Sequence, residues 1–142
     1  MTTATRPIRD TADDDGDVGT DSLLRFALRA DATLCGGLGL IIVMAADPLS
    51  RVSGLSATSE WIAGAALVAY GLALFLGAAV PDVRRLGVGV LAGNVAFAVV
   101  VSAVLVAGLL PLTEFGVVGI AAFTVATVAF AWAQYLGIRR LT

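Results

Sequence analysis

Three polar side chains lie inside apolar stretches of this sequence, where a polar group needs a hydrogen-bond partner. Asp31 follows the segment 24-LRFALRA-30, Asn94 lies within a long apolar run, and Gln134 lies close to the C-terminus. A carboxylate and two carboxamides can share hydrogen bonds, and an aspartate held away from water can also bind and release a proton. The candidate site is therefore a buried polar cluster of Asp31, Asn94 and Gln134.

Other kinds of chemistry have little support in the sequence. It contains no histidine and one cysteine, Cys35, so a Ser-His-Asp triad, an intramolecular disulfide, a CxxC motif and a multi-cysteine metal site are excluded. Cys35 is expected to be a small packed side chain. Asp47 and Glu60 lie where helices should begin and are expected to cap them. We therefore expect no catalytic, cofactor-binding or metal-binding residue, and no enzymatic activity.

Four apolar stretches must position these residues. The chain is 58% hydrophobic and 14% charged, whereas soluble domains are about 45–50% apolar and about 25% charged. Each stretch is close to the ~20 residues that a helix needs to cross a bilayer, where unpaired backbone groups are not tolerated. The stretches are residues 26–46, 61–80, 86–110 and 115–138. We predict an all-α membrane protein, an antiparallel bundle of four transmembrane helices within residues 22–142.

Proline and acidic residues separate the stretches. The first three end at Asp47-Pro48, Pro81-Asp82 and Pro111. Ser59 and Thr113 should cap the second and fourth helices. The longest connection, residues 47–60, should hold a short surface helix closed by Gly54. The other connections are short, so consecutive helices are expected to be antiparallel neighbours.

The first stretch has a second interpretation as a signal peptide. Arg25 and Arg29 flank its start, and 43-VMA-45 resembles a cleavage site. An acidic segment of more than 20 residues precedes it, however, and three more apolar stretches follow. These features favour a helix that is retained.

The distribution of arginine predicts the orientation of the chain. All nine positive charges are arginines, and the topology places eight of them on one side and only Arg51 on the other. Basic residues that flank membrane helices stay on the cytoplasmic side. We predict a multi-pass protein of the plasma (inner) membrane with both termini in the cytoplasm. The expected orientation anchors are Arg25, Arg29, Arg84, Arg85, Arg139 and Arg140.

Residues 1–21 differ from the rest of the chain in composition. They hold two arginines and six aspartates, a net charge of −4, whereas the whole chain carries −2. Without aromatic residues and with little to bury, this segment is expected to be a disordered acidic cytoplasmic tail. The alternative is that it recruits a cytoplasmic partner. The sequence argues against nucleic-acid binding, because no basic patch with interleaved aromatic residues is present.

Small residues predict how the helices pack, since close approach in lipid depends on them. The expected contact faces are 36-GGLG-39, the series Ala65, Ala69, Ala73 and Gly77, and the GxxxG motif of Gly89 and Gly93. We expect these faces to pack within the chain; the alternative is a homodimer or an unknown membrane partner. Two polar faces should also point inward. They are Asn94, Ala98 and Ser102 on the third stretch, and Thr124, Thr127, Ala131 and Gln134 on the fourth.

The depth of the polar residues places them in one leaflet. At ~1.5 Å per residue, Asp31, Asn94 and Gln134 should lie roughly 8, 12 and 6 Å from the cytoplasmic ends of their helices. Arg29 is a poor partner for Asp31, because side chains two positions apart on a helix point about 200° away from each other. The expected partners of Asp31 are Asn94, Gln134, or an arginine from 84–85 or 139–140.

The segments 28-LRADA-32, 93-GN-94 and 134-QYLGIRR-140 resemble a group of small, uncharacterised four-span integral membrane proteins of actinobacteria. The resemblance covers most of residues 23–141 and implies a topology but no activity. We therefore expect a non-enzymatic structural or accessory membrane subunit whose main partner is the lipid bilayer. The alternative is a small proton-coupled transporter with Asp31 as its titrating group, although no glycine–proline break marks a broken helix.

Overall fold

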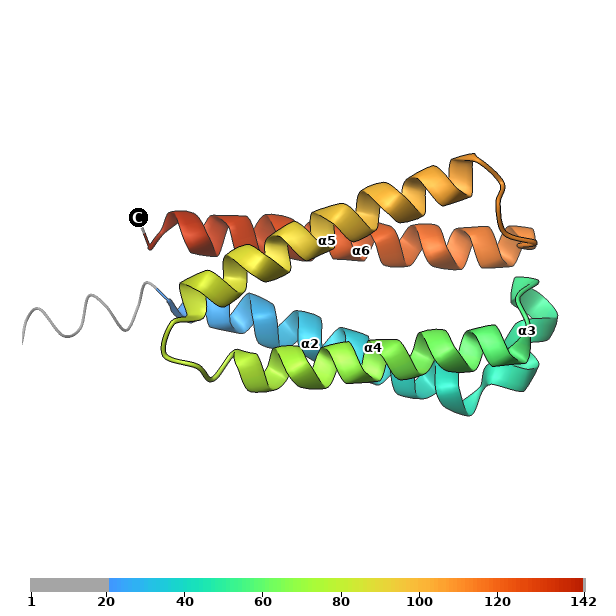
Figure 1. Ribbon diagram of the computed structural model, residues 1–142, viewed down its shortest axis with the longest axis horizontal. Coiled ribbons are helices and arrows are strands. Elements are labelled where there is room, and N and C mark those ends of the chain that lie inside the picture. Colours follow the sequence, from blue (N-terminus) through green and yellow to red (C-terminus); the bar gives the residue numbers. More distant parts are fainter. Residues whose placement is uncertain (1–20, 142) are drawn as a thin grey trace, which may run out of the picture.

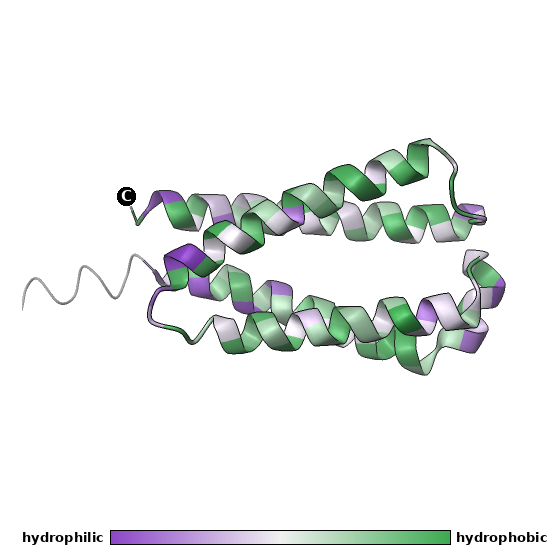
Figure 2. Ribbon diagram, in the orientation of Figure 1, coloured by the Kyte–Doolittle hydropathy of each residue, from purple (hydrophilic) through white to green (hydrophobic). Residues whose placement is uncertain are grey.

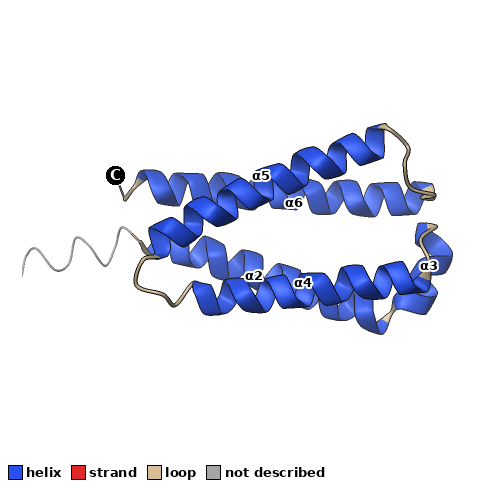
Figure 3. Ribbon diagram, in the orientation of Figure 1, coloured by secondary structure: helices blue, strands red, loops and turns tan. Residues whose placement is uncertain are grey.

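The computed structural model describes residues 21–141, which form five α-helices and no strand (Figures 1 and 3). They are α2 (Ser22–Met44), α3 (Ala46–Ser53), α4 (Ala57–Gly77), α5 (Val83–Val106) and α6 (Glu114–Arg139). All except α3 are long and apolar enough to cross a membrane, which indicates a multi-pass membrane protein. The predicted acidic tail, apart from Asp21, lies outside the described residues.

Three of the long helices, α2, α4 and α5, begin about one turn before the apolar stretches that predicted them. In α4 and α5 the reason is a polar cap. Ser56 Oγ accepts a hydrogen bond from Ser59 N at 3.0 Å, and Asp82 Oδ1 accepts one from Arg85 N at 3.3 Å. Ser59 was predicted as the cap of α4 and instead lies in its first turn. Thr113 caps α6 as predicted.

The two carboxylates that were predicted as caps, Asp47 and Glu60, do not occupy cap positions. Asp47 lies within the first turn of α3, whose cap position is Ala45. Glu60 is buried, and its Oε1 accepts a hydrogen bond of 2.5 Å from Ser53 Oγ. Glu60 therefore connects the end of α3 to the start of α4, because a buried carboxylate takes the nearest available donor.

The end of α3 fits closely against the start of α6. Gly54 closes α3 with φ +88°, as predicted, and a Cβ there would lie 2.2 Å from Pro111 O. Ser53 O accepts a hydrogen bond from Thr113 N at 2.9 Å. The short helix is thus fixed to the segment that leads into α6.

The four long helices form two antiparallel pairs, α2 with α4 and α5 with α6, and the pairs meet chiefly along α2 and α6 (Figure 1). Helices α4 and α5 scarcely touch, although residues 78–82 join them directly. The prediction that short connections join packed neighbours is correct for α5 and α6 and wrong for α4 and α5. The reason is that α4 directs its close-packing face toward α2.

Glycines allow the backbones of α2 and α4 to approach. A Cβ on Gly71 would lie 2.7 Å from both Ala32 O and Gly36 N. A Cβ on Gly39 would lie 2.6 Å from Gly64 O. The segment 36-GGLG-39 therefore packs within the chain as predicted, and its partner face on α4 is formed by glycines rather than by the alanine series.

Two other predicted packing faces point elsewhere. In the predicted series of α4, Ala69 and Ala73 are exposed and Ala65 is half-buried, while Gly77 packs against Leu86 of α5. Gly89 and Gly93 of α5 are also exposed, and a Cβ on either would meet nothing within 4 Å. The prediction that this GxxxG motif packs within the chain is wrong, because α5 meets its neighbours through the face that carries Asn94.

Hydrophilic residues gather at the two ends of the helices, with apolar residues between them (Figure 2). The start of α2, the connection 78–82 and the end of α6 lie together at one end, which we call the arginine-rich end (Figure 1). It carries Arg25, Arg29, Arg84, Arg85, Arg139 and Arg140. The opposite end, which we call the α3 end, carries Arg51.

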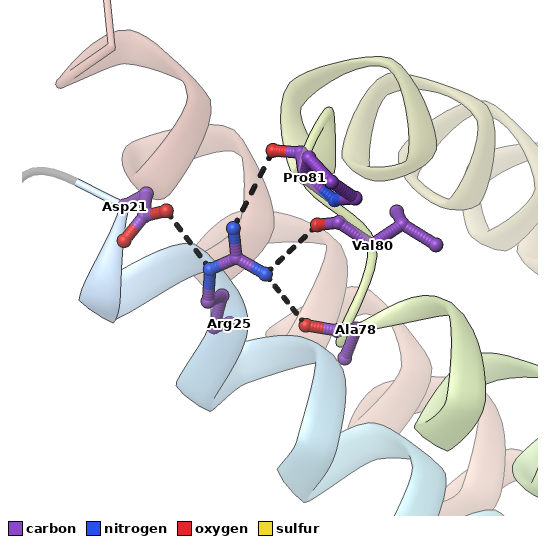
Figure 4. Close-up of polar contacts among 5 residues, drawn as sticks. All are labelled: Asp21, Arg25, Ala78, Val80 and Pro81. Carbon is purple, nitrogen blue, oxygen red and sulfur yellow. Dashed lines mark hydrogen bonds and ion pairs between the residues drawn. The ribbon is translucent and has the colours of Figure 1, made fainter.

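Arg25 does more than anchor the end of a helix. Its Nε forms an ion pair with Asp21 at 2.8 Å (Figure 4). Its Nη1 donates to Ala78 O at 2.8 Å and to Val80 O at 3.0 Å, and Nη2 donates to Pro81 O at 3.5 Å. These carbonyls belong to the end of α4 and the turn after it, so Arg25 fastens that turn to α2. Arg29 is exposed on the helix surface.

Replacing Arg25 by glutamine should destabilise the fold by about 1–3 kcal/mol, because hydrogen bonds to a charged group are lost along with the ion pair. Unfolding in detergent titrated with sodium dodecyl sulfate measures the effect. Arg29→Gln is the matched control and should change the unfolding free energy little. Equal effects of the two variants would contradict the conclusion that Arg25 fastens the turn after α4 to α2.

Candidate functional site

Asp31 of α2 is buried, with 2% of its surface exposed. Its Oδ2 accepts hydrogen bonds from Asn94 Nδ2 and from Gln134 Nε2, both at 3.0 Å. Its Oδ1 accepts one from the thiol of Cys35 at 3.4 Å. All three bonds run toward the carboxylate, whose oxygens act as acceptors.

Asn94 of α5 connects the remaining members of the site. Its Nδ2 donates to Gln134 Oε1 at 3.2 Å as well as to Asp31, so both amide hydrogens are used. Its Oδ1 accepts a hydrogen bond of 3.2 Å from the hydroxyl of Tyr70 on α4. We call Asp31, Cys35, Tyr70, Asn94 and Gln134 the polar cluster. Each of the four long helices contributes at least one side chain to it.

The structure brings together Asp31, Asn94 and Gln134, the three residues that the sequence grouped by depth. The arginines offered as alternative partners lie on the surface. Arg84, Arg85, Arg139 and Arg140 are all exposed. Arg85 forms an exposed ion pair of 2.9 Å with Asp82. The hydrogen bonds to Asp31 therefore come from amides and a thiol.

Sequence reasoning missed Tyr70. A tyrosine in a membrane helix is usually assigned to the aromatic belt at the lipid interface, and its hydroxyl is not counted as an internal donor. A signal was nevertheless present, because Tyr70 carries the only hydroxyl in residues 61–80. Its ring remains partly exposed, and its hydroxyl reaches across from α4 to α5. Cys35 was likewise expected only to pack, and it also donates to Asp31.

The two predicted polar faces differ in how far they are buried. On α6 all four residues are buried: Thr124, Thr127, Ala131 and Gln134. On α5, Asn94 and Ala98 are buried but Ser102 is exposed. The reason is that α5 diverges from α2 and α4 toward the α3 end (Figure 1). The prediction of one continuous inward face is therefore wrong for the last turns of α5.

An apolar core lies between the polar cluster and the arginine-rich end. Its buried members are Leu24, Leu28, Ala32, Leu74, Ala78 and Val83. A Cβ on Gly137 would lie 2.9 Å from Leu24 Cα, so α6 approaches the backbone of α2 closely here. Gln134 lies about one turn earlier on α6, and from there its side chain reaches Asp31.

The polar cluster is closed and internally satisfied. Among the described residues, no buried side-chain nitrogen or oxygen lacks a hydrogen bond. Within the same part of the chain, no group of three or more His, Cys, Asp and Glu side chains could hold a metal ion. Hydrogen bonds between helices are worth about 0.6–2 kcal/mol each in a membrane. The arrangement can therefore hold the two helix pairs in register.

Replacing Tyr70 by phenylalanine should destabilise the protein by about 1 kcal/mol, because Asn94 Oδ1 then loses the donor that reaches it from α4. The same unfolding titration measures this effect. Tyr135→Phe removes a hydroxyl from a partly exposed ring outside the polar cluster and serves as the control. If Tyr70→Phe were no more destabilising than Tyr135→Phe, the hydroxyl would have no part in joining α4 to α5.

Comparisons with known proteins found no match to this chain among protein-family models, curated proteins or solved structures.

Proposed function

We propose that this protein is a non-enzymatic structural or accessory subunit of the plasma membrane, with the four-span topology that its resemblance to small membrane proteins of actinobacteria implies. The observation that carries the proposal is the polar cluster, in which donors from α2, α5 and α6 converge on one buried carboxylate. A group that is fully bonded within the chain is suited to fastening helices.

The proposal includes an orientation with both termini in the cytoplasm. Six of the described arginines lie at the arginine-rich end, and Arg51 lies at the α3 end. The positive-inside rule then assigns the arginine-rich end to the cytoplasm. A green fluorescent protein fused after Thr142 should fluoresce, and an alkaline phosphatase inserted after Leu55 should be active. The opposite pattern would reverse the orientation.

Proton flux distinguishes a structural role from transport. Purified protein is reconstituted into liposomes that enclose a pH-sensitive dye, and a potassium diffusion potential is imposed. We expect the internal pH to follow that of empty liposomes, because every hydrogen bond of Asp31 is made within the cluster. A flux that Asp31→Asn abolishes would overturn the structural proposal and identify a carrier with Asp31 as its titrating group.

A further inference from the structure

An aromatic and basic series runs along the surface of α6 at the arginine-rich end. Trp132, Tyr135 and Arg139 are exposed, and 63% of the Trp132 surface is accessible. Their spacing of three and four residues places them on one face of the helix. We call Trp132, Tyr135 and Arg139 the α6 ladder. It lies away from the face that carries Gln134 into the polar cluster.

Contacts within the α6 ladder hold its members in order. The rings of Trp132 and Tyr135 have centroids 5.7 Å apart and are tilted by 37°. Arg139 Cζ lies 5.7 Å from the centroid of the Tyr135 ring, within the range of a cation–π interaction. At ~1.5 Å per residue the ladder spans about 10 Å along the helix. The guanidinium lies at the polar end of this span and the indole at the apolar end.

The charges around the α6 ladder are mainly positive. Arg140 follows Arg139, and the first turn of α5 supplies Arg84 and Arg85. The two helix ends are adjacent because their apolar side chains share one core. These side chains are Val83, Leu86, Ile138 and Leu141. Asp82 offsets Arg85 through an ion pair of 2.9 Å. Among the described residues, arginines therefore outnumber carboxylates on this surface.

We propose that the α6 ladder is a binding site for an anionic phospholipid, with the headgroup phosphate at Arg139 and an acyl chain along Trp132 and Tyr135. Guanidinium groups bind phosphate strongly, and exposed aromatic rings favour the boundary between headgroups and acyl chains. Basic groups at a membrane surface attract anionic lipids in particular. The proposal rests on the membrane location proposed above.

The chain has two tryptophans, so the fluorescence of one can report lipid binding at the α6 ladder and that of the other can report binding elsewhere on the surface. Trp132 belongs to the α6 ladder, and Trp61 lies exposed at the α3 end beside acidic rather than basic neighbours. In Trp61→Phe protein the fluorescence reports on Trp132 alone, and in Trp132→Phe protein it reports on Trp61. Each variant is reconstituted with brominated phosphatidylglycerol or with brominated phosphatidylcholine, at equal mole fractions.

We expect brominated phosphatidylglycerol to quench Trp132 about threefold more effectively than brominated phosphatidylcholine at low salt, with a smaller ratio at high salt. Arg139→Gln in the Trp61→Phe background should bring the ratio close to one. Arg51→Gln in that background is the matched control and should leave the ratio unchanged. The Trp61 reporter should show no preference.

Equal quenching of Trp132 by the two lipids would overturn the lipid site, and so would a preference that persists in Arg139→Gln. An equal preference at Trp61 would also overturn it, since the effect would then belong to the whole surface. If neither tryptophan is quenched by any brominated lipid, the membrane location itself fails. Circular dichroism of each variant confirms that the helices are retained.

Discussion

Asp31→Asn should lower the free energy of unfolding by about 2–4 kcal/mol. The carboxylate accepts hydrogen bonds from Asn94, Gln134 and Cys35. Two of these donors, Asn94 Nδ2 and Gln134 Nε2, point at the same oxygen, Oδ2, so an asparagine can present its amide oxygen to both. Its NH₂ group then faces the Cys35 thiol in place of Oδ1, so that hydrogen bond is lost, and a neutral oxygen accepts the other two more weakly than a carboxylate does.

The decisive control is the exchange variant Asp31→Asn with Asn94→Asp. It moves the carboxylate from α2 to α5 while keeping the composition of the polar cluster. The new carboxylate can accept from the amide at position 31 and from the Tyr70 hydroxyl, so most of the lost stability should return. Unfolding in detergent titrated with sodium dodecyl sulfate measures all three proteins. Asp31→Asn as stable as the parent would mean that the cluster contributes nothing to folding.

Gly71→Leu should destabilise the protein by about 3 kcal/mol or more, because overpacking against backbone cannot be relieved by rotating a side chain. The atoms that a Cβ would meet, at 2.7 Å, are Ala32 O and Gly36 N of α2. Helices α2 and α4 would have to separate. Because Tyr70 is next to Gly71, the separation should also weaken the hydrogen bond between Tyr70 and Asn94.

Gly93→Leu is the matched control for Gly71→Leu. Both changes replace a glycine inside a long helix and gain about 1 kcal/mol of helix propensity. A Cβ at Gly93 meets nothing within 4 Å in the single chain. Gly93→Leu should therefore be neutral or slightly stabilising under the same titration. Loss of stability at Gly93 equal to that at Gly71 would mean that the α2–α4 contact is not the tight one.

The contrast between these glycines illustrates what a motif can predict. The spacing of Gly89 and Gly93 is the one that favours close helix contact, yet both residues are exposed. Gly64 and Gly71 do not form a GxxxG motif, yet they carry the close contact with α2. A GxxxG motif indicates that another helix could approach the backbone closely at that position. Whether one does depends on which helices cross there.

The sequence predicted the polar cluster in part because depth is a local property. Counting residues from the helix ends placed Asp31, Asn94 and Gln134 at similar heights, and their hydrogen bonds agree with that count. The same reasoning could not decide whether amides or arginines bind to Asp31. That choice depends on rotation about each helix axis, and this rotation places the arginines on the surface.

The sequence by itself determined that the chain forms long apolar helices, where they are interrupted, and that six of the described arginines share one end. These features follow from hydropathy and from proline and cap residues, which act over a few neighbouring positions. Only the tertiary structure decided that α2 pairs with α4, that α4 and α5 scarcely touch, and that Tyr70 joins Asn94. These contacts join residues far apart in the sequence, 24 positions in the case of Tyr70 and Asn94, and their geometry is set by close packing of backbones that no local pattern specifies.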